Sequence, residues 1–268
     1  MTCGPRRICL RLMYEGTRYS GWQMQPGRRT VQGALADAIR SISGEDLVPR
    51  GTSRTDAGVH ALGQVAHFHV ETHLDDDRLR HALNAHLPEG VIVRRLETCA
   101  DDFHAQFDAC GKRYAYRVET GRFRLPFPPR YTHFVRDPLD LAAMREAAQR
   151  FVGKQDFAAL ASAGSPRKST VRTIRSLHIV ARRSSFAIVV EGDGFLYNMV
   201  RTIAGTLLDV GRGKLDAARV GEILRSCDRR EAAATAPAEG LYLLSVLYEP
   251  RAFLGPDRGP RGVPGLFG

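Results

Sequence analysis

Apolar and polar residues alternate along several segments of the chain, and an alternation of period two predicts half-buried β-strands. In the first such segment, residues 7–14, one face carries Ile8, Leu10, Leu12 and Tyr14. Further strands are expected over residues 47–53, 64–70, 91–97, 112–119, 172–182, 185–191 and 241–248. The chain is therefore predicted to be built largely on β-sheet.

Between these strands, apolar residues recur three or four positions apart, which predicts amphipathic helices. The clearest one covers residues 31–42, where Thr30 precedes the pattern as an N-cap and Gly44 ends it. The other helices are expected over residues 75–86, 141–151, 200–211 and 216–226.

The order strand, helix, strand, strand, helix, strand occurs once in the N-terminal part, and the C-terminal part has a similar content of elements. This organisation predicts an α+β fold with two ferredoxin-like or RRM-like halves, a mainly antiparallel sheet and a cleft between the halves. We expect an N-terminal domain over residues 1–105 and a C-terminal domain over residues 106–250. Residues 251–268 are rich in Gly and Pro and lack periodicity, so a tail is expected there.

Composition places the chain among globular proteins, with 43% hydrophobic and 25% charged residues. The 39 Lys and Arg outnumber the 29 Asp and Glu, giving a net charge of +10. The excess is concentrated, because no acidic residue lies between Asp156 and Glu191 and only Glu119 is acidic within residues 109–136. Such blocks favour a polyanionic partner such as nucleic acid. A general bias towards arginine is the alternative interpretation.

Several classes of protein are disfavoured. No apolar run reaches membrane-spanning length, and the N-terminus does not resemble a signal peptide, so we expect a cytoplasmic protein. The five cysteines contain no CxxC pair, which argues against a zinc site or a disulfide framework. His67 and His69 share a strand face and form a possible metal pair, but no third ligand has an obvious spacing, so no metal is predicted.

The densest group of chemically distinctive residues spans positions 51–61, between two predicted strands, and Asp56 is its only carboxylate. In such a loop an aspartate can be a nucleophile, a base, a metal ligand or simply the residue that forms an Asx-turn.

The sequence around this aspartate, Arg-Thr-Asp-Ala-Gly-Val-His-Ala at positions 54–61, has companions elsewhere in the chain. Distinctive segments occur in order at residues 14–25, 102–107, 112–116, 198–201 and 236–243. Together they resemble the motifs of the tRNA pseudouridine synthase A family. One departure is Ser53, where that family often has glycine, and its Cβ would shift the loop if a positive φ were required there.

The resemblance implies isomerisation of uridine to pseudouridine at nucleotides 38, 39 and 40 in the anticodon stem-loop of tRNA. It implies no metal or organic cofactor, and a homodimeric enzyme. Asp56 is then the nucleophile or catalytic carboxylate acting on a flipped-out uridine, and Arg201 holds that carboxylate in its charged form.

The remaining site residues follow from the same resemblance. Tyr114 contacts the target uracil, Leu241 lines the uracil pocket, and Arg54 fills the space left by the flipped base or binds a neighbouring phosphate. Tyr116 is better suited to the core, and a structural hydrogen bond is expected for His60.

Two other functions fit part of the pattern. A non-catalytic RNA-binding protein with RRM-like domains explains the charge and the fold, although the RNP1 pattern with its paired aromatic residues is absent. An Asp-dependent hydrolase or phosphotransferase is less favoured, because the sequence contains no P-loop, nucleophile elbow or HExxH motif.

Overall fold

The computed structural model describes residues 4–124, 130–162, 169–182 and 184–249. The chain divides into two compact units, one made of Met1–Cys110 with Tyr242–Gly268 and the other of Gly111–Leu241. The division differs from the expected one, since nearly all of the strand expected at residues 241–248 belongs with the N-terminal part. The predicted tail, residues 251–268, lies outside the described residues.

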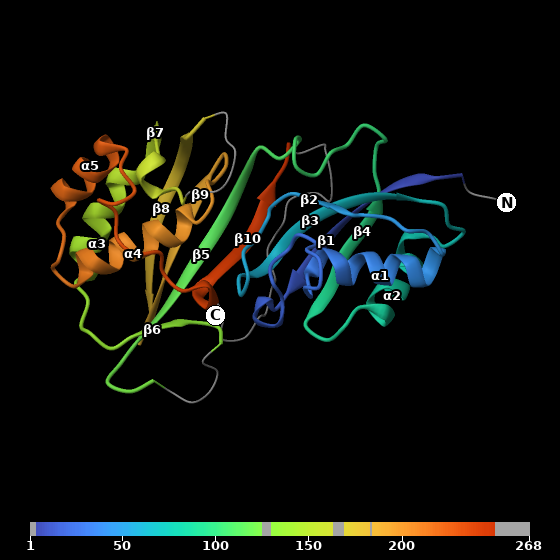
Figure 1. The fold of residues 1–268 in the computed structure, drawn as a ribbon, viewed down its shortest axis with the longest axis horizontal. Coiled ribbons are helices and arrows are strands. Elements are labelled where there is room, and N and C mark those ends of the chain that lie inside the picture. Colours follow the sequence, from blue (N-terminus) through green and yellow to red (C-terminus); the bar gives the residue numbers. More distant parts are fainter. Residues whose placement is uncertain (1–3, 125–129, 163–168, 183, 250–268) are drawn as a thin grey trace. The chain divides into compact units, whose positions relative to one another are not determined.

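The first unit is built on a mainly antiparallel sheet with strand order β4-β1-β3-β10 (Figure 1). Strand β1 pairs antiparallel with both β3 and β4, the short β2 pairs with β3, and β10 runs parallel to β3. The strands are β1 (Arg6–Tyr14), β2 (Arg50–Gly51), β3 (His60–Val70), β4 (Val91–Thr98) and β10 (Leu241–Leu247). The parallel pairing places Tyr242 opposite His60, at the point where β3 leaves the loop of Asp56.

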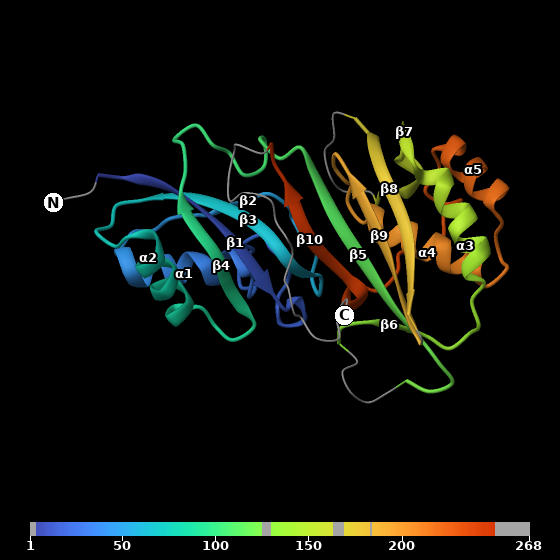
Figure 2. The ribbon, with the colours of Figure 1, turned by 180° about the vertical axis from the view of Figure 1, so that it is seen from behind.

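Two helices, α1 (Val31–Ser43) and α2 (Asp76–His86), lie side by side in this unit (Figure 1, Figure 2). Thr30 caps α1 by accepting the amide hydrogen of Gly33 at 3.2 Å. Gly44 ends it in the left-handed region, with φ 76°. The predicted start and stop signals of this helix are therefore confirmed.

The second unit has an antiparallel sheet of order β5-β9-β8-β7, with β6 parallel to β5. Helices α3, α4 and α5 pack together on one side of this sheet (Figure 1, Figure 2). The strands are β5 (Gly111–Thr120), β6 (His133–Val135), β7 (Gly153–Asp156), β8 (Val171–Arg182) and β9 (Ser185–Gly192). The helices are α3 (Leu141–Ala148), α4 (Met199–Gly211) and α5 (Ala217–Ser226). Short 3-10 turns occur at Gly16–Arg18, Gln149–Phe151, Ala158–Leu160 and Ala238–Gly240.

The α+β class and the mainly antiparallel pairing are confirmed. One prediction was too long, because the strand expected over residues 47–53 is reduced to Arg50–Gly51. Pro49 has no amide hydrogen to donate. The amide of Ser53 donates to the side chain of Gln64 and not to a backbone carbonyl of β3. The helices expected from periodicity are all present, and no helix among the described residues is long and apolar enough to cross a membrane.

A second prediction was wrong in its detail. The alternation in residues 7–14 predicts a strand buried on one face, but Cys9 and Arg11, on the other face, are also buried. The chain that follows β4 covers that other face, where the Phe103 ring packs edge-on against His67 of β3. Strand β1 is therefore enclosed on both sides.

Candidate active site

The loop of Asp56 connects β2 to β3, and its side chains divide into an inner and an outer set. Thr52, Ser53 and Thr55 are buried, whereas Arg54 is exposed and Asp56 is half-buried. The turn closes where the amide of Val59 donates to the carbonyl oxygen of Asp56 at 3.1 Å. The loop thus buries its hydroxyl residues, leaves Arg54 exposed to solvent and leaves Asp56 partly accessible.

The inner set is fixed by side chains from β1 and β3. The Tyr14 hydroxyl lies 2.7 Å from the hydroxyl of Thr55. Gln64 forms two hydrogen bonds with the backbone of Ser53, accepting from its amide at 3.2 Å and donating to its carbonyl at 2.6 Å. Thr55 and Ser53, which precede Asp56 in the loop, are therefore each held by a side chain from a strand.

Two glycines allow the segment after β1 to press against the same loop. A Cβ at Gly16 would lie 2.0 Å from the carbonyl oxygen of Val59, and one at Gly21 would lie 2.5 Å from that of Thr55. Gly21 also has a φ of +90°, which favours glycine. The next residue, Trp22, donates its amide hydrogen to the Thr55 carbonyl at 3.0 Å. The segments 14–25 and 54–61, distinct in sequence, are thus one structural unit around Asp56.

His60 has a structural hydrogen bond, as expected. Its Nδ1 atom accepts the amide hydrogen of Gly16 at 3.1 Å, and its ring stacks on Tyr242 with centroids 4.7 Å apart. The side chain is 1% exposed. His60 therefore joins the loop to the segment after β1 and to β10.

A third motif, residues 102–107, is anchored beneath the loop. The carbonyl oxygen of Ala105 accepts hydrogen bonds from Thr52 at 2.9 Å and from the Tyr248 hydroxyl at 2.6 Å. The amide of Ala105 donates to Nδ1 of His67 at 3.1 Å. Burial lowers the pKa of His67 to about 4 and raises that of Tyr248.

The two histidines considered as a metal pair have separate environments. His67 is buried against Ala105, whereas His69 is exposed and accepts a hydrogen bond from Nε of Arg7 at 3.1 Å. The described residues contain no group of three or more His, Cys, Asp or Glu side chains arranged to hold a metal ion.

Tyr114, Arg201 and Leu241 belong to the second unit, whereas Arg54 and Asp56 belong to the first. Tyr114 is buried in β5 opposite Val190. Its ring makes a T-shaped contact with the ring of Phe195, with centroids 5.2 Å apart. This edge-to-face arrangement is one that aromatic pairs favour.

Tyr116 is in the core, as expected. It is fully buried, and its hydroxyl donates to the carbonyl oxygen of Pro237 at 2.9 Å. The pKa of the Tyr116 hydroxyl is raised, mainly because the side chain is buried. Tyr116 therefore supports the segment that leads to Leu241.

Arg201, in the first turn of α4, supports the same segment. Its Nε donates to the carbonyl oxygen of Ala236 at 2.7 Å, and one terminal nitrogen donates to Asn198 at 3.0 Å. The amide of Ala236 in turn donates to the Arg201 carbonyl at 3.1 Å. Arg201 is thus linked through residues 236–240 to Leu241, which is 6% exposed.

The departure at Ser53 requires no shift of the loop. The non-glycine residues with positive φ in the described part of the chain are Asn198 and Cys227, so the backbone of Ser53 is in a region open to any residue. Serine is accommodated there without the backbone strain that was considered from the sequence.

No supporting role was predicted from the sequence for four residues that hold the loop in place, namely Gly16, Gly21, Thr52 and Gln64. Tyr14 was interpreted as an apolar strand position and as the first residue of the distinctive segment 14–25, with no role in supporting Asp56. The glycines lie in the same segment, and Thr52 lies in the group of distinctive residues 51–61, so a signal was available for all of these except Gln64. The supporting contacts themselves were not predictable, because they depend on which backbone groups the fold leaves unpaired.

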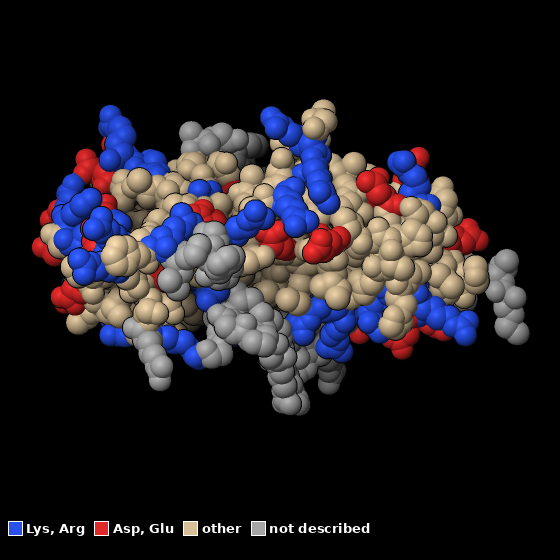
Figure 3. Space-filling model, turned by 90° about the horizontal axis from the view of Figure 1, so that it is seen from below, with Lys and Arg blue, Asp and Glu red and all other residues tan. Residues whose placement is uncertain are grey.

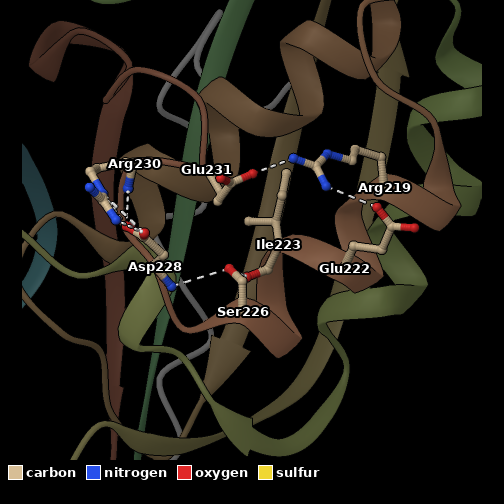
Figure 4. A network of polar contacts seen from close by, with 7 residues as sticks. All are labelled: Arg219, Glu222, Ile223, Ser226, Asp228, Arg230 and Glu231. Carbon is tan, nitrogen blue, oxygen red and sulfur yellow. Dashed lines mark hydrogen bonds and ion pairs between the residues drawn. The ribbon is translucent and has the colours of Figure 1, made fainter.

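Lys and Arg side chains occur on both units and are interspersed with Asp and Glu on the face seen in Figure 3. Part of the predicted basic block, residues 163–168 and 183, lies outside the described residues. Some arginines are paired locally, as around the end of α5 (Figure 4). There Arg219 contacts Glu222 at 2.9 Å and also Glu231, and Arg230 contacts Asp228 at 2.6 Å. Such pairs reduce the charge available to a polyanion, whereas the exposed Arg54 shares its loop with a single carboxylate.

Comparison with known proteins gives a consistent result. The model of a family described as tRNA pseudouridine synthase matches residues 12–108 and 147–249. A tRNA pseudouridine synthase A of Acetivibrio thermocellus is 43% identical over 91% of this chain and 100% of its own length. One of Brevibacillus brevis is 42% identical over the same shares. A solved archaeal box H/ACA sRNP Nop10-Cbf5 complex covers 88% of this chain and 57% of that chain at 10% identity and a TM-score of 0.32, too low a likeness to bear on function.

Proposed function

Because this chain belongs to the tRNA pseudouridine synthase family, we propose that it isomerises uridines 38, 39 and 40 of the tRNA anticodon stem-loop, with Asp56 as the catalytic carboxylate. The observation that carries the proposal is the construction of the Asp56 loop. Side chains and close backbone contacts fix residues on both sides of Asp56, while Asp56 itself is only half-buried. A carboxylate held in this way is preorganised for chemistry on a substrate.

The reaction breaks the bond from ribose C1′ to uracil N1 and forms a bond from C1′ to uracil C5. The proton on C5 is lost and N1 gains one, so substrate and product have the same composition and no cofactor is required. Asp56 assists either by attacking the sugar or the ring, or by removing a ribose proton. All three routes require the carboxylate close to the target nucleotide.

The uridine must leave the stem before it can react, at a cost of a few kcal/mol. We propose that the ring of Tyr114 stacks on the extruded uracil, which returns about 1–3 kcal/mol, and assists transfer of the C5 proton. Leu241 supplies an apolar wall to the uracil pocket. Arg54 fills the vacated space in the stem or binds an adjacent phosphate.

Arg201 keeps the role that the family resemblance gives it, which is to favour the charged form of Asp56. Its bonds to Ala236 and Asn198 support this role, because they limit the movement of the guanidinium. The proposal also includes a homodimer and a cytoplasmic location. It further includes a ferredoxin-like arrangement of both halves, supported in the first unit by the order β4-β1-β3 with β2 on β3.

Tritium release from tRNA transcripts carrying [5-³H]uracil tests the proposal, because the C5 hydrogen is lost when pseudouridine forms. We expect release that depends on uridine at positions 38, 39 or 40, and none from a matched transcript with cytidine at all three. No release from any tRNA contradicts the proposed enzyme activity. Equal release from the matched transcript contradicts the proposed positions.

A further inference from the structure

Two cysteines lie on neighbouring chains of the first unit, at the end of β1 and β4 that is remote from Tyr14 and the Asp56 loop. Cys9 is opposite Glu97 in the β1–β4 ladder. Cys99 follows β4 and extends the ladder, since its amide donates to the carbonyl oxygen of Arg7 at 3.0 Å. Residues opposite each other in an antiparallel pair point to the same face, so Cys9 and Cys99 are diagonal neighbours on one face.

The two thiols differ in environment and are near enough for each to shift the pKa of the other. Cys9 is 0% exposed, whereas Cys99 is partly accessible to solvent. The Cys99 thiol also lies 3.6 Å from the carbonyl oxygen of Arg7. An accessible thiol thus has a buried second thiol within reach, the arrangement of an attacking and a resolving cysteine.

The charges around the pair favour reaction at Cys99. The neighbouring Cys9 thiol and then the positive charge of Arg7 lower the pKa of Cys99, against the opposing effects of burial and of the Glu97 carboxylate. Burial raises the pKa of Cys9. The thiolate form, which is the reactive one, is therefore favoured at the accessible cysteine.

We propose that Cys99 and Cys9 form an oxidisable pair that a peroxide converts into a disulfide between β1 and the chain that follows β4. The Cys99 thiolate attacks one peroxide oxygen, the O–O bond breaks, and Cys99 sulfenic acid and water form. The Cys9 sulfur then attacks the Cys99 sulfur and displaces the hydroxyl group, which leaves as water with the Cys9 proton. Two thiols are oxidised by two electrons, and the peroxide is reduced to two waters.

Closing the bond requires a small movement. Diagonal neighbours have Cβ atoms up to about 7 Å apart, whereas a disulfide requires about 4 Å. Cys99 supplies the movement, since it lies beyond the last residue of β4, Thr98, and is joined to β1 there by the hydrogen bond from its own amide to the Arg7 carbonyl. This site is separate from the Asp56 loop, and the inference does not depend on the proposed function.

The direct test uses a variant in which Cys3, Cys110 and Cys227 are replaced by serine, leaving only the pair. After treatment with hydrogen peroxide and denaturation in an alkylating reagent, we expect a monomer that has lost two hydrogens and takes up no reagent. A reductant should restore two alkylation sites. Reagent uptake at both cysteines after peroxide treatment, or a disulfide-linked dimer, would overturn the proposal.

Single substitutions in the same variant separate the two roles. With Cys9→Ser, oxidation should stop at a sulfenic acid on Cys99 that dimedone traps. With Cys99→Ser, Cys9 should remain a thiol, and oxidation of Cys9 at the rate of the intact pair would contradict the assigned order.

Peptide mapping of the oxidised wild-type protein gives the same answer without relying on the folding of a variant. The expected product links the peptide of Cys9 to that of Cys99. Cys227, which is exposed, serves as the internal comparison. A product in which Cys227 is oxidised while the pair remains reduced would show that exposure alone governs reactivity, and would refute the inference.

Discussion

At Thr55, one hydroxyl contact joins the loop of Asp56 to the centre of the first sheet. The partner is Tyr14, a buried residue whose ring packs near Trp22, with centroids 6.3 Å apart. Because both hydroxyls are buried, removal of the Tyr14 hydroxyl takes from Thr55 the partner that fixes its side chain. Positioning of Asp56 thus depends on a residue of β1 that lies outside the loop.

Tyr14→Phe should lower kcat by about ten- to a hundredfold, because small displacements of a reacting group are costly, with KM for tRNA little changed. It should also lower the free energy of unfolding by about 1–3 kcal/mol. The partly exposed Tyr197 provides the control, as Tyr197→Phe should change stability by less than about 0.5 kcal/mol. Steady-state kinetics and urea unfolding provide both quantities, and an unchanged kcat in Tyr14→Phe would disprove the positioning role.

The lowered pKa of His67 predicts that the free energy of unfolding depends on pH. Its pKa is about 4 in the folded protein and 6.5 as the ordinary value, so the unfolded chain binds a proton that the folded protein does not. The stability is then complete above pH 6.5 and declines as the pH falls from 6.5 to 4, by on the order of 2 kcal/mol.

His67→Gln removes the titrating ring and keeps an oxygen that can accept the Ala105 amide hydrogen. Over the same pH range, its unfolding free energy should fall less steeply than that of the wild type. Urea unfolding at several pH values measures the difference. Parallel curves for the two proteins would mean that His67 does not titrate as described.

At the scale of elements, α4 is the most enclosed helix of the second unit, and Gly205 lies where it meets the chain before Leu241. A Cβ at Gly205 would lie 2.1 Å from the carbonyl oxygen of Ala234. At Gly221, on α5, a Cβ would meet nothing within 4 Å. The two glycines therefore have opposite roles, although both are helical.

Gly205→Ala should destabilise the protein by roughly 1–3 kcal/mol and reduce turnover, because the segment 234–241 must move. Gly221→Ala should stabilise it by about 0.5–1 kcal/mol, since alanine is the better helix former. Thermal unfolding of the two variants side by side tests the pair. Equal shifts of Tm in the same direction would contradict this account of the packing of α4.

Elements were more predictable from the sequence than contacts were. Helix α1 follows from its apolar spacing, Thr30 and Gly44, because those signals act within a few residues. Strands β6 and β7 were missed because they are short and lack a clear alternation. The support of the loop by Gln64 was not predictable, since it depends on strand pairing between β1, β2 and β3. Asp56 was found through its motif, and without that resemblance the turn-forming role remained open.

At the scale of the whole molecule, the net charge of +10 predicts salt-dependent binding of tRNA. An arginine contributes to this binding when its side chain is exposed and is not already paired with a carboxylate. Arg54 is exposed on the Asp56 loop, whereas Arg219 forms ion pairs with Glu222 and Glu231 (Figure 4).

Arg54→Ala should weaken tRNA binding and reduce the slope of log K against log salt concentration by about 0.7–0.9, as for the loss of one phosphate contact. Arg219→Ala, which removes the same charge from a paired site, should leave both affinity and slope near wild type. Filter binding across a range of KCl concentrations measures both. A larger effect from Arg219→Ala than from Arg54→Ala would reverse the assignment of the RNA-binding surface.

The most direct test of the account is a single-turnover measurement on Asp56→Asn with saturating enzyme and unmodified tRNA. The substitution preserves the shape of the side chain and the backbone hydrogen bond from Val59. We predict that pseudouridine formation slows by roughly a thousandfold or more while the affinity for tRNA remains close to wild type. Formation of pseudouridine by Asp56→Asn at a rate near that of the wild-type protein would contradict the assignment of Asp56 as the catalytic carboxylate.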